Sequence, residues 1–491
     1  METEKKEKTG FKPLKMNALW GVLIFVLISA AIAVQKVVFD GNMGAMFLML
    51  WIILIPIGLL FGHKPKDLVD AGIKFAHGAL MPVFIFLTVG ALISTWIASG
   101  TTPALIYYGI KIISPKLFLV TAMLLCSVVS LVTGTSNGTA GTAGLAMIGI
   151  GTGLGIPPAI TAGAVFCGAM FGDKMSPMSD TTILASSISK VNIFKHIKHM
   201  LYDQIPAYLI SIVFFLFIGF KYSGTLDLSS VNALTDGLKG HFNMGFWAFI
   251  PLIVTVGLML LKVPSLLAML SGAITAIVVA IAYQGVPVAD AFNTFYSGFS
   301  IESGNEILDK LLNRGGIADM WSLAGVTLFG FTVAGMLQHM KALECIANAL
   351  VKRIKNVAGI TVLNILFGFL GNAVAMSQNF AIVMTGTLMA PVYPKYNLQP
   401  KNCSRDLEVG GTYGALFIPW NVNTIFMAGV LGVGVTAFIP YIPLLYLTPI
   451  IVIVFALFKF RLTKIYDDVG YVDVSERLEN DPEKQAEISG L

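Results

Sequence analysis

Polar side chains interrupt an otherwise apolar stretch between residues 159 and 189. The run from Gly172 to Thr182 reads GDKMSPMSDTT. Its candidate ion ligands are Asp173, Ser176, Ser179, Asp180, Thr181 and Thr182. Charged groups inside a membrane are energetically costly and usually serve a function. Carboxylate, hydroxyl and carbonyl oxygens are hard ligands, so the run predicts a site for a small cation such as Na⁺.

Asp180 is the residue that we predict to be shared by Na⁺ and a proton. Gly172 and Pro177 interrupt the helix, and the opened backbone adds carbonyl oxygens to the carboxylate. A carboxylate that binds either a cation or a proton, but not both, is sufficient for exchange. Asp173 is a second candidate for this role, although Asp173 and Lys174 also fit a structural ion pair.

Two further polar clusters lie 242 residues apart, where the chain is predicted to reverse inside the membrane. They are Thr135, Ser136 and Asn137 in the first cluster and Ser377, Gln378 and Asn379 in the second. Non-helical backbone at membrane depth is tolerated only beside protein or a water-filled cavity. We therefore predict that both clusters, with Ser136 and Asn137 in the first, lie beside protein or a water-filled cavity near the functional site that contains Asp180. The alternative is that these residues are simply good turn formers.

A second interrupted stretch covers residues 406–431 and contains LEVGGTYGALFIPWN. Its Pro419 lies 242 residues after Pro177, which is also the spacing of the two polar clusters. Its neutral polar candidates are Thr412, Asn421 and Asn423. Glu408 is a third candidate carboxylate, at the site or at the membrane surface. Arg405 and Asp406 are predicted to begin a helix at that surface, so no arginine is expected in the core.

The composition places these residues in a membrane. Of 491 residues, 56% are hydrophobic and only 12% are charged, which cannot coat a soluble protein of this length. A net charge of +5, spread along the chain, excludes the clustered basic surface of a nucleic-acid-binding protein. The four cysteines have no paired spacing that predicts a disulfide or a metal site. Eight apolar runs are long enough to cross a bilayer: 18–38, 43–61, 78–98, 203–222, 245–261, 265–283, 319–337 and 437–458.

The pattern predicts an all-α polytopic protein with about ten spans and two re-entrant hairpins in two inverted repeats. A basic N-terminus, 1–17, precedes the first repeat, 18–222, with a hairpin at 117–154 and a broken helix at 159–189. A linker, 223–244, leads to the second repeat, 245–458, with a hairpin at 357–390 and a broken helix at 406–431. An acidic tail, 459–491, is predicted to be partly disordered. The Lys and Arg distribution predicts that both termini are cytoplasmic in the cell membrane.

The GDKMSPMSDTT run and the later LEVGGTYGALFIPWN segment resemble the NhaC-type sodium/proton antiporters of the ion transporter superfamily. The resemblance extends over residues 18–460. It implies a scaffold domain that forms a homodimer, a moving transport domain with two opposed hairpins, and elevator-like alternating access. It also implies cation contacts from Ser136 and Asn137 with the 173–180 loop, and from Ser377 and Asn379 with Asn421 and Asn423.

The predicted function is exchange of Na⁺ for H⁺ across the lipid bilayer, with no cofactor besides the transported Na⁺. The alternative is a coupled exchanger of organic anions of the malate or lactate type. Lys174 and half-helix N-termini would then supply positive charge. An enzyme is not predicted, because the six histidines do not accompany a nucleophile: His63, His196 and His199 are assigned to cytoplasmic ends, His241 to the linker, and His77 and His339 to interfaces.

Overall fold

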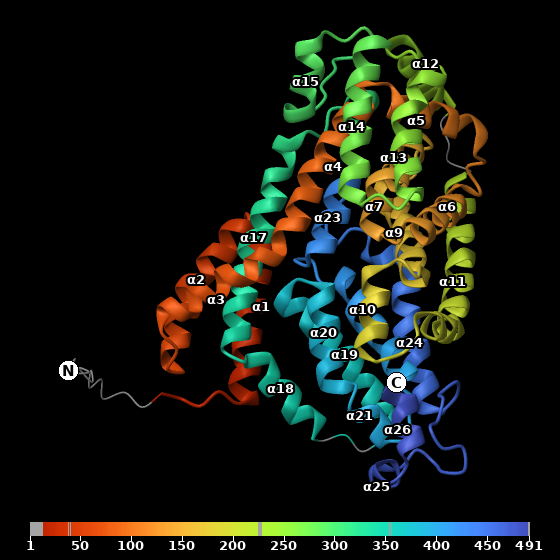
Figure 1. Ribbon diagram of the computed structural model, residues 1–491. Helices are drawn as coiled ribbons and strands as arrows, with labels where there is room; N and C mark the ends of the chain where they lie inside the picture. Colours follow the sequence, from red (N-terminus) through yellow and green to blue (C-terminus); the bar gives the residue numbers. More distant parts are fainter. Residues whose placement is uncertain are drawn as a thin grey trace, which may run out of the picture. The chain divides into compact units, whose positions relative to one another are not determined.

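The computed structural model describes residues 13–37, 39, 41–223, 228–352, 354 and 356–489. Throughout this part of the chain the regular structure is helical, and the only strand-like pairings are two isolated bridges, Phe299 with Arg314 and Leu398 with Lys464. The predicted all-α class is therefore confirmed for these residues (Figure 1). The first twelve residues of the predicted basic N-terminus lie outside them.

The chain divides into two compact units, and the smaller contains Met1–Leu80 and Val326–Arg353. Its helices are α1 (Ala18–Val37), α2 (Met43–Leu60), α3 (Pro65–Ala76), the later part of α17 (Ile317–His339) and α18 (Ala342–Val351). In this unit, helices α2 and α3 pack closely against α17. A Cβ atom on Gly72 would lie 2.9 Å from the Thr332 carbonyl oxygen, and the Trp51 indole donates a 2.8 Å hydrogen bond to the Thr332 hydroxyl.

The larger unit, Met81–Gly325 and Ile354–Leu491, contains every candidate ion ligand. Its first helices are α4 (Leu80–Ala98), α5 (Thr101–Ile112), α6 (Phe118–Thr133), α7 (Ser136–Thr139), α8 (Leu145–Gly153), α9 (Pro158–Met175), α10 (Asp180–Ile188) and α11 (Ile193–Ser223). Next are α12 (Leu228–His241), α13 (Ile250–Leu260), α14 (Ser265–Ala282), α15 (Val288–Ser297) and α16 (Glu306–Leu312). The last are α19 (Val357–Ala375), α20 (Gln378–Met389), α21 (Val392–Lys395), α22 (Pro400–Leu407), α23 (Val422–Leu431), α24 (Pro443–Leu457), α25 (Ser475–Glu479) and α26 (Pro482–Ser489).

Among the described residues, six helices are long and apolar enough to cross a membrane, and the number rises to eight if each bent helix pair is one span. The six are Met43–Leu60, Pro65–Ala98, Ile193–Tyr222, Ser265–Ala282, Ile317–His339 and Val357–Ala375. The bent pairs are Asn232–His241 with Phe246–Leu260, at 98°, and Pro400–Phe417 with Val422–Leu431, at 51°. Helices such as α6 and α24 fall below the roughly 20 residues of a straight span. The predicted number of ten spans is therefore not reached by this measure.

The same local structures recur 242 residues apart in the larger unit. Gly134 directly follows helix α6, and Met376 directly follows α19. Both residues have left-handed backbone angles, with φ of 69° and 56°. The next residues, Thr135 and Ser377, each cap the following helix with a side-chain oxygen. Sequence spacing and backbone conformation therefore both follow the predicted internal repeat. The inverted orientation of its two copies stays a prediction.

Close helix packing also recurs at this spacing. A Cβ atom on Gly168 in α9 would lie 2.2 Å from the Met123 carbonyl oxygen in α6. A Cβ atom on Gly410 would lie 2.6 Å from the carbonyl oxygen of Ile365 in α19. Each broken helix thus packs directly against the backbone of the hairpin that precedes it, as small residues allow in membrane proteins.

We expect Gly168→Ala to destabilise the protein by about 1–3 kcal/mol, because the added methyl group clashes with backbone that has no room to move. Gly257→Ala in α13 is the matched control, since no described atom lies within 4 Å of its Cβ position. Thermal unfolding of the detergent-solubilised variants measures the difference. Equal melting temperatures for the two variants would contradict close packing of α9 on α6.

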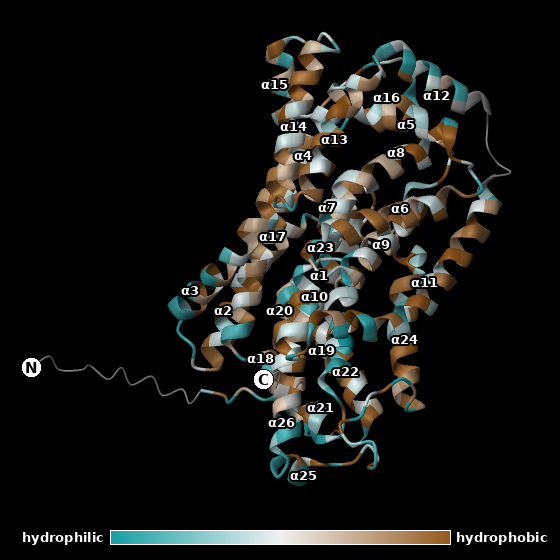
Figure 2. Cartoon of the chain, turned by 45° about the vertical axis from the view of Figure 1, so that its right-hand side comes forward, coloured by the Kyte–Doolittle hydropathy of each residue, from teal (hydrophilic) through white to brown (hydrophobic). Residues whose placement is uncertain are grey.

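Two predicted segments differ from the structure in detail. The predicted linker, 223–244, contains helix α12, and its residues 224–227 lie outside the described part. The second broken helix begins at Pro400 rather than at residue 406, because proline is well suited to the first turn of a helix. Figure 2 shows the polar colouring of α25 and α26 against the largely apolar α11 and α24.

The described part of the acidic tail is folded, so the prediction of partial disorder was wrong there. A small apolar cluster within the tail contains Ile465, Tyr466 and Val474, and residues of α25 and α26 pack against it. The buried Asn397 side chain donates hydrogen bonds to the carbonyl oxygens of Tyr466 and Gly470, both at 2.9 Å. In the tail itself, a hydrogen bond from Arg477 lowers the pKa of Asp468. The tail is therefore attached to the loop that precedes α22.

Candidate functional site

The tip of the first hairpin contacts the break between α9 and α10. The Ser136 backbone N–H donates a 3.0 Å hydrogen bond to Oδ2 of Asp173, and Thr135 caps α7 by accepting from Gly138. Gly134 lies so close to the Met178 backbone that a Cβ atom would be 2.9 Å from it. A short polar turn thus meets the last turn of α9, which ends where the GDKMSP run stops being helical.

Three side-chain oxygens at this junction are buried without a hydrogen-bond partner among the described residues. They are Oγ1 of Thr133, Oδ1 of Asn137 and Oδ1 of Asp173. The Asp173 side chain is 3% exposed, and the hydroxyl groups of Ser136 and Ser179 lie close to its carboxylate. An unsatisfied buried oxygen normally costs about 1–3 kcal/mol. Several of them beside one carboxylate are an arrangement that a bound cation would satisfy.

A chain of amides joins the first hairpin to the second broken helix. The Asn137 side chain donates to Oδ1 of Asn423 at 2.9 Å, and the Asn423 backbone N–H donates to Oδ1 of Asn421 at 3.0 Å. Asn421 donates in turn to Oδ1 of Asn372 in α19, also at 3.0 Å. The first and second repeats therefore meet through predicted site residues. Asn372 also donates to the Gly411 carbonyl oxygen at 2.6 Å, which holds the opened backbone.

The second hairpin tip contacts the first break. Asn379 donates a 3.2 Å hydrogen bond to Oδ2 of Asp180, and the Thr181 backbone N–H donates to the other oxygen at 3.0 Å. The side chains of Asp180 and Asn379 are both exposed, in contrast to the buried Asp173. Helix α10 accordingly packs against α20, and α7 lies beside α23, within the larger unit (Figure 1). The crossed pairs, Asn137 with Asn423 and Asn379 with Asp180, relate each hairpin to the other repeat's break.

Glu408 lies fully buried at the start of a short π-helical segment, Glu408–Thr412. Thr412 donates a 2.5 Å hydrogen bond to one Glu408 oxygen, and the other oxygen has no partner in the described part of the chain. Gln378 of the second tip donates to the Thr412 carbonyl oxygen at 3.1 Å. Interruptions of this kind in α-helices often mark functional positions. The Glu408 side chain is thus buried inside the protein.

The other predicted residues shape the turns. Ser377 caps α20, and Ser179 caps α10 while contacting the Thr181 hydroxyl at 3.0 Å. The Ser176 hydroxyl accepts from the Met178 backbone N–H, and the Thr182 hydroxyl donates to the Lys174 carbonyl oxygen at 3.1 Å. Across the described residues, no group of three His, Cys, Asp or Glu side chains is arranged for a metal ion.

Arg405 and Asp406, which were predicted to begin a helix at the membrane surface, are buried inside the larger unit, and their helix α22 begins earlier, at Pro400. Both side chains are 0% exposed and form an ion pair at 2.8 Å. Asp406 also accepts hydrogen bonds from Tyr393 at 2.6 Å and from Thr361 at 2.9 Å. Because two further donors satisfy the carboxylate, the pair can remain buried beside α19. An arginine is therefore present in the core of the larger unit, where none was expected.

Lys174 lies in a second polar cluster that the sequence did not predict. Its ammonium lies 4.3 Å from the centre of the Tyr413 ring and has no hydrogen-bond partner among the described groups. Tyr413 donates a 2.6 Å hydrogen bond to Gln204, which donates to Asp203 at 2.7 Å. The proposed pairing of Lys174 with Asp173 alone is thus replaced by a cation–π contact near the charges of Asp203 and Glu408.

Some of these residues carried a signal in the sequence. Asn372 interrupts the apolar face of α19, and Asp203 with Gln204 begins an apolar run, so each is a polar group at membrane depth. His196 and His199, assigned to a cytoplasmic end, are buried in the first turns of α11. Their burial could not be predicted, because it depends on how α22 packs against α11.

We expect Asn137→Ala to weaken the apparent Na⁺ affinity by about 5–30-fold, because a lost ligand costs roughly 1–2 kcal/mol. Asn379→Ala at the second tip should have an effect in the same range. Asn356→Ala is the control, since Asn356 caps the far end of α19 and lies away from both tips. Na⁺ titration of proton movement in proteoliposomes measures the affinity. Normal Na⁺ affinity in both tip variants would show that the tips only form turns and do not bind the cation.

Comparisons with known proteins place this site in a family. A model of the Na⁺/H⁺ antiporter family matches residues 11–184 and 168–460. A malate-2H⁺/Na⁺-lactate antiporter of Bacillus subtilis is 38% identical over 432 residues, which cover 88% of this chain and 92% of the relative. The Na⁺/H⁺ antiporter NhaC of Alkalihalophilus pseudofirmus is 35% identical and covers 92% of this chain and 96% of its own.

A second NhaC, from Bacillus subtilis, is 32% identical and covers 82% of this chain and 89% of its own. The matches extend across both hairpins and both broken helices, so they include all the candidate ligands. Together with the apolar helices, they identify a multi-pass membrane transporter and confirm the resemblance found in the two polar motifs. This chain belongs to the Na⁺/H⁺ antiporter family.

Proposed function

We propose that this protein exchanges Na⁺ for H⁺ across the cell membrane by alternating access. The observation that carries the proposal is the junction of the first hairpin with the α9–α10 break. There the buried Asp173 carboxylate accepts from the Ser136 backbone, while one oxygen each of Asp173 and Asn137 has no partner in the described structure. Either a proton or Na⁺ satisfies this carboxylate, and the binding of one displaces the other.

Asp173 is our preferred seat for the exchanged ions, and Asp180 is assigned to the approach to it. The sequence alone favoured Asp180, and both residues belong to the same interrupted helix. Asp173 is 3% exposed, whereas Asp180 is exposed and accepts from Asn379 of the opposite hairpin. A carboxylate removed from water gains more from a cation or a proton than one that water already solvates.

Glu408 is proposed to influence the same site without being its primary ligand. Thr412 already occupies one of its oxygens at 2.5 Å, and the neighbouring backbone is held by Asn372 and Gln378. The amide chain from Asn372 through Asn421 and Asn423 to Asn137 then connects the second broken helix to the cation site. Movement of one repeat against the other would change these contacts, as alternating access requires.

Coupled exchange of an organic anion is a second candidate function. Two observations favour it: the buried Lys174 ammonium, which has no hydrogen-bond partner among the described groups, and the similarity to a malate-2H⁺/Na⁺-lactate antiporter. An anion would gain from Lys174, but the core arginine is already paired with Asp406. Because bidentate recognition of a carboxylate usually needs an available guanidinium, we rank this function second.

The proposal includes a homodimer in the lipid bilayer with both termini in the cytoplasm. Na⁺ and H⁺ are its transported ions, with no separate cofactor and no nucleic acid. The dimer rests on the resemblance to the superfamily, and the orientation rests on the positive residues that the sequence places on one side. Both can be tested by cross-linking and by labelling single cysteines from each side of the membrane.

Reconstitution in proteoliposomes containing a pH-sensitive dye tests the proposed function. We expect a Na⁺ pulse to move protons without any organic anion, and K⁺ to move none. Malate and lactate are then added in turn, with Li⁺ as a further cation. Proton movement that requires malate or lactate would replace the first function with the second.

A further inference from the structure

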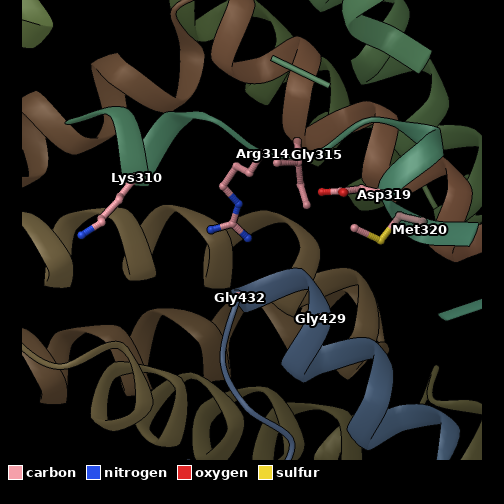
Figure 3. Close-up of a pocket in the computed structure, with 8 residues that line it drawn as sticks. Lys310, Arg314, Gly315, Asp319, Met320, Gly429 and Gly432 are labelled. Carbon is pink, nitrogen blue, oxygen red and sulfur yellow. The ribbon is translucent and has the colours of Figure 1, made fainter. Parts of the chain in front are cut away.

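A pocket of about 250 Å³ lies where the loop between α16 and α17 meets the C-terminal end of α23. It is separate from the ion site, because Asn421 and Asn423 lie at the opposite end of α23. Arg314, Asp319 and Lys310 are the charged residues that line it. Figure 3 shows the Arg314 guanidinium pointing toward Gly432 and the Asp319 carboxylate pointing into the same space.

Backbone contacts hold the loop that carries Arg314. The Gly316 N–H donates a 2.7 Å hydrogen bond to the Gly90 carbonyl oxygen of α4, and the Phe299 N–H donates to the Arg314 carbonyl oxygen at 3.3 Å. A Cβ atom on Gly315, which has a left-handed φ of 84°, would lie 2.8 Å from Ile93 in α4. These contacts with α4 and Phe299 therefore fix the backbone that carries Arg314.

Arg314 reaches the end of α23 and retains most of its hydrogen-bonding capacity. Its Nη2 donates a 2.6 Å hydrogen bond to the Val430 carbonyl oxygen, which satisfies the helix end. A Cβ atom on Gly432 would lie 3.3 Å from both terminal nitrogens, so this glycine gives the guanidinium its space. A guanidinium has five N–H donors, and in the described structure only this one hydrogen bond is found.

Asp319 provides the opposite charge on the other side of the pocket. It lies in the first turn of α17, and no described group hydrogen-bonds to its carboxylate or pairs with it within 4.0 Å. Asp319 and Lys310 are both exposed, but Lys310 already pairs with Glu306 at 2.6 Å. The pocket thus presents one cation and one anion that face the same space without neutralising each other directly.

We propose that this pocket binds a small zwitterion that carries a carboxylate and an ammonium on neighbouring atoms, as an α-amino acid does. The ligand carboxylate would accept from the Arg314 fork, for which guanidinium geometry is well suited. Its ammonium would donate to Asp319. A simple carboxylate would instead meet repulsion from Asp319, and a simple amine would meet repulsion from Arg314. This binding does not depend on the proposed ion exchange.

Isothermal titration of the full-length protein in detergent tests the proposal with alanine, acetate and methylammonium as probes. We expect alanine to bind at least about tenfold more tightly than either single-charge probe. Arg314→Lys should lose this binding while keeping a donor for Val430, so loss of folding does not confuse the result. Asp319→Asn should abolish the preference for alanine over acetate. Lys310→Gln is the control and should bind alanine normally.

Three results would overturn the proposal. The first is the absence of alanine binding to the wild-type protein. The second is equal binding of alanine and acetate, which would make the pocket an anion site. The third is unchanged alanine binding in Arg314→Lys and Asp319→Asn, which would place the amino acid elsewhere in the protein.

Discussion

Asp173→Asn is expected to abolish Na⁺-driven proton movement in proteoliposomes, reducing it to the level of protein-free vesicles. The substitution keeps the size of the side chain and an oxygen that can accept from the Ser136 N–H. It removes the charge that must be neutralised by either Na⁺ or a proton, so the two ions no longer compete for one group. Thermal unfolding of the same sample checks that the variant is folded.

Asp180→Asn tests whether the exchanged ions bind at Asp173 or at Asp180, the residue that the sequence favoured. Because the Asp180 side chain is exposed, we expect this substitution to weaken the apparent Na⁺ affinity and leave measurable exchange. In the wild-type protein, the apparent Na⁺ affinity should fall as pH falls, by up to about tenfold per pH unit for one displaced proton. Loss of exchange in Asp180→Asn with near-normal exchange in Asp173→Asn would return the role to Asp180.

Arg405→Met is expected to destabilise the protein by about 3–5 kcal/mol, because it leaves the fully buried Asp406 carboxylate without its cation. Tyr393 and Thr361 would still donate to this carboxylate, but neither carries a positive charge. The effect should appear as a large fall in melting temperature in detergent. It should also reduce the amount of protein inserted in the membrane.

The double variant Arg405→Met with Asp406→Asn is the matched control. The amide introduced in place of the Asp406 carboxylate would keep an acceptor for Tyr393 and Thr361 but would remove the uncompensated charge. We therefore expect the double variant to recover most of the lost stability. If the single variant is as stable as the wild type, or if the double variant recovers nothing, the pair contributes no electrostatic stabilisation to the core.

The polar breaks in the helices could be predicted from the sequence because they depend on local chemistry. Glycine, proline and short polar residues interrupt apolar helices wherever they cluster, and the spacing of 242 residues relates Pro177 to Pro419. The backbone angles of Gly134 and Met376 follow the same spacing. The number of spans was harder to predict, since several helices are too short to be recognised by length alone.

The partners of the buried charges could not be read from the sequence because they come from distant elements. Arg405 lies in a polar segment, PKNCSRDL, whose composition is typical of a membrane surface. Its burial depends on Thr361 and Tyr393, which are brought to Asp406 by α19 and α21. The choice between Asp173 and Asp180 likewise depends on which side chain the hairpin tips cover, and this is a tertiary property.

Proton release on Na⁺ binding tests most directly whether Asp173 is the shared seat of the two ions. Purified protein in weakly buffered detergent solution receives NaCl, with choline chloride as the control, while a dye reports pH. We expect saturable acidification by the wild-type protein, a shifted but present signal from Asp180→Asn, and none from Asp173→Asn. Unchanged Na⁺-dependent acidification by Asp173→Asn would show that the shared seat of Na⁺ and H⁺ is another group.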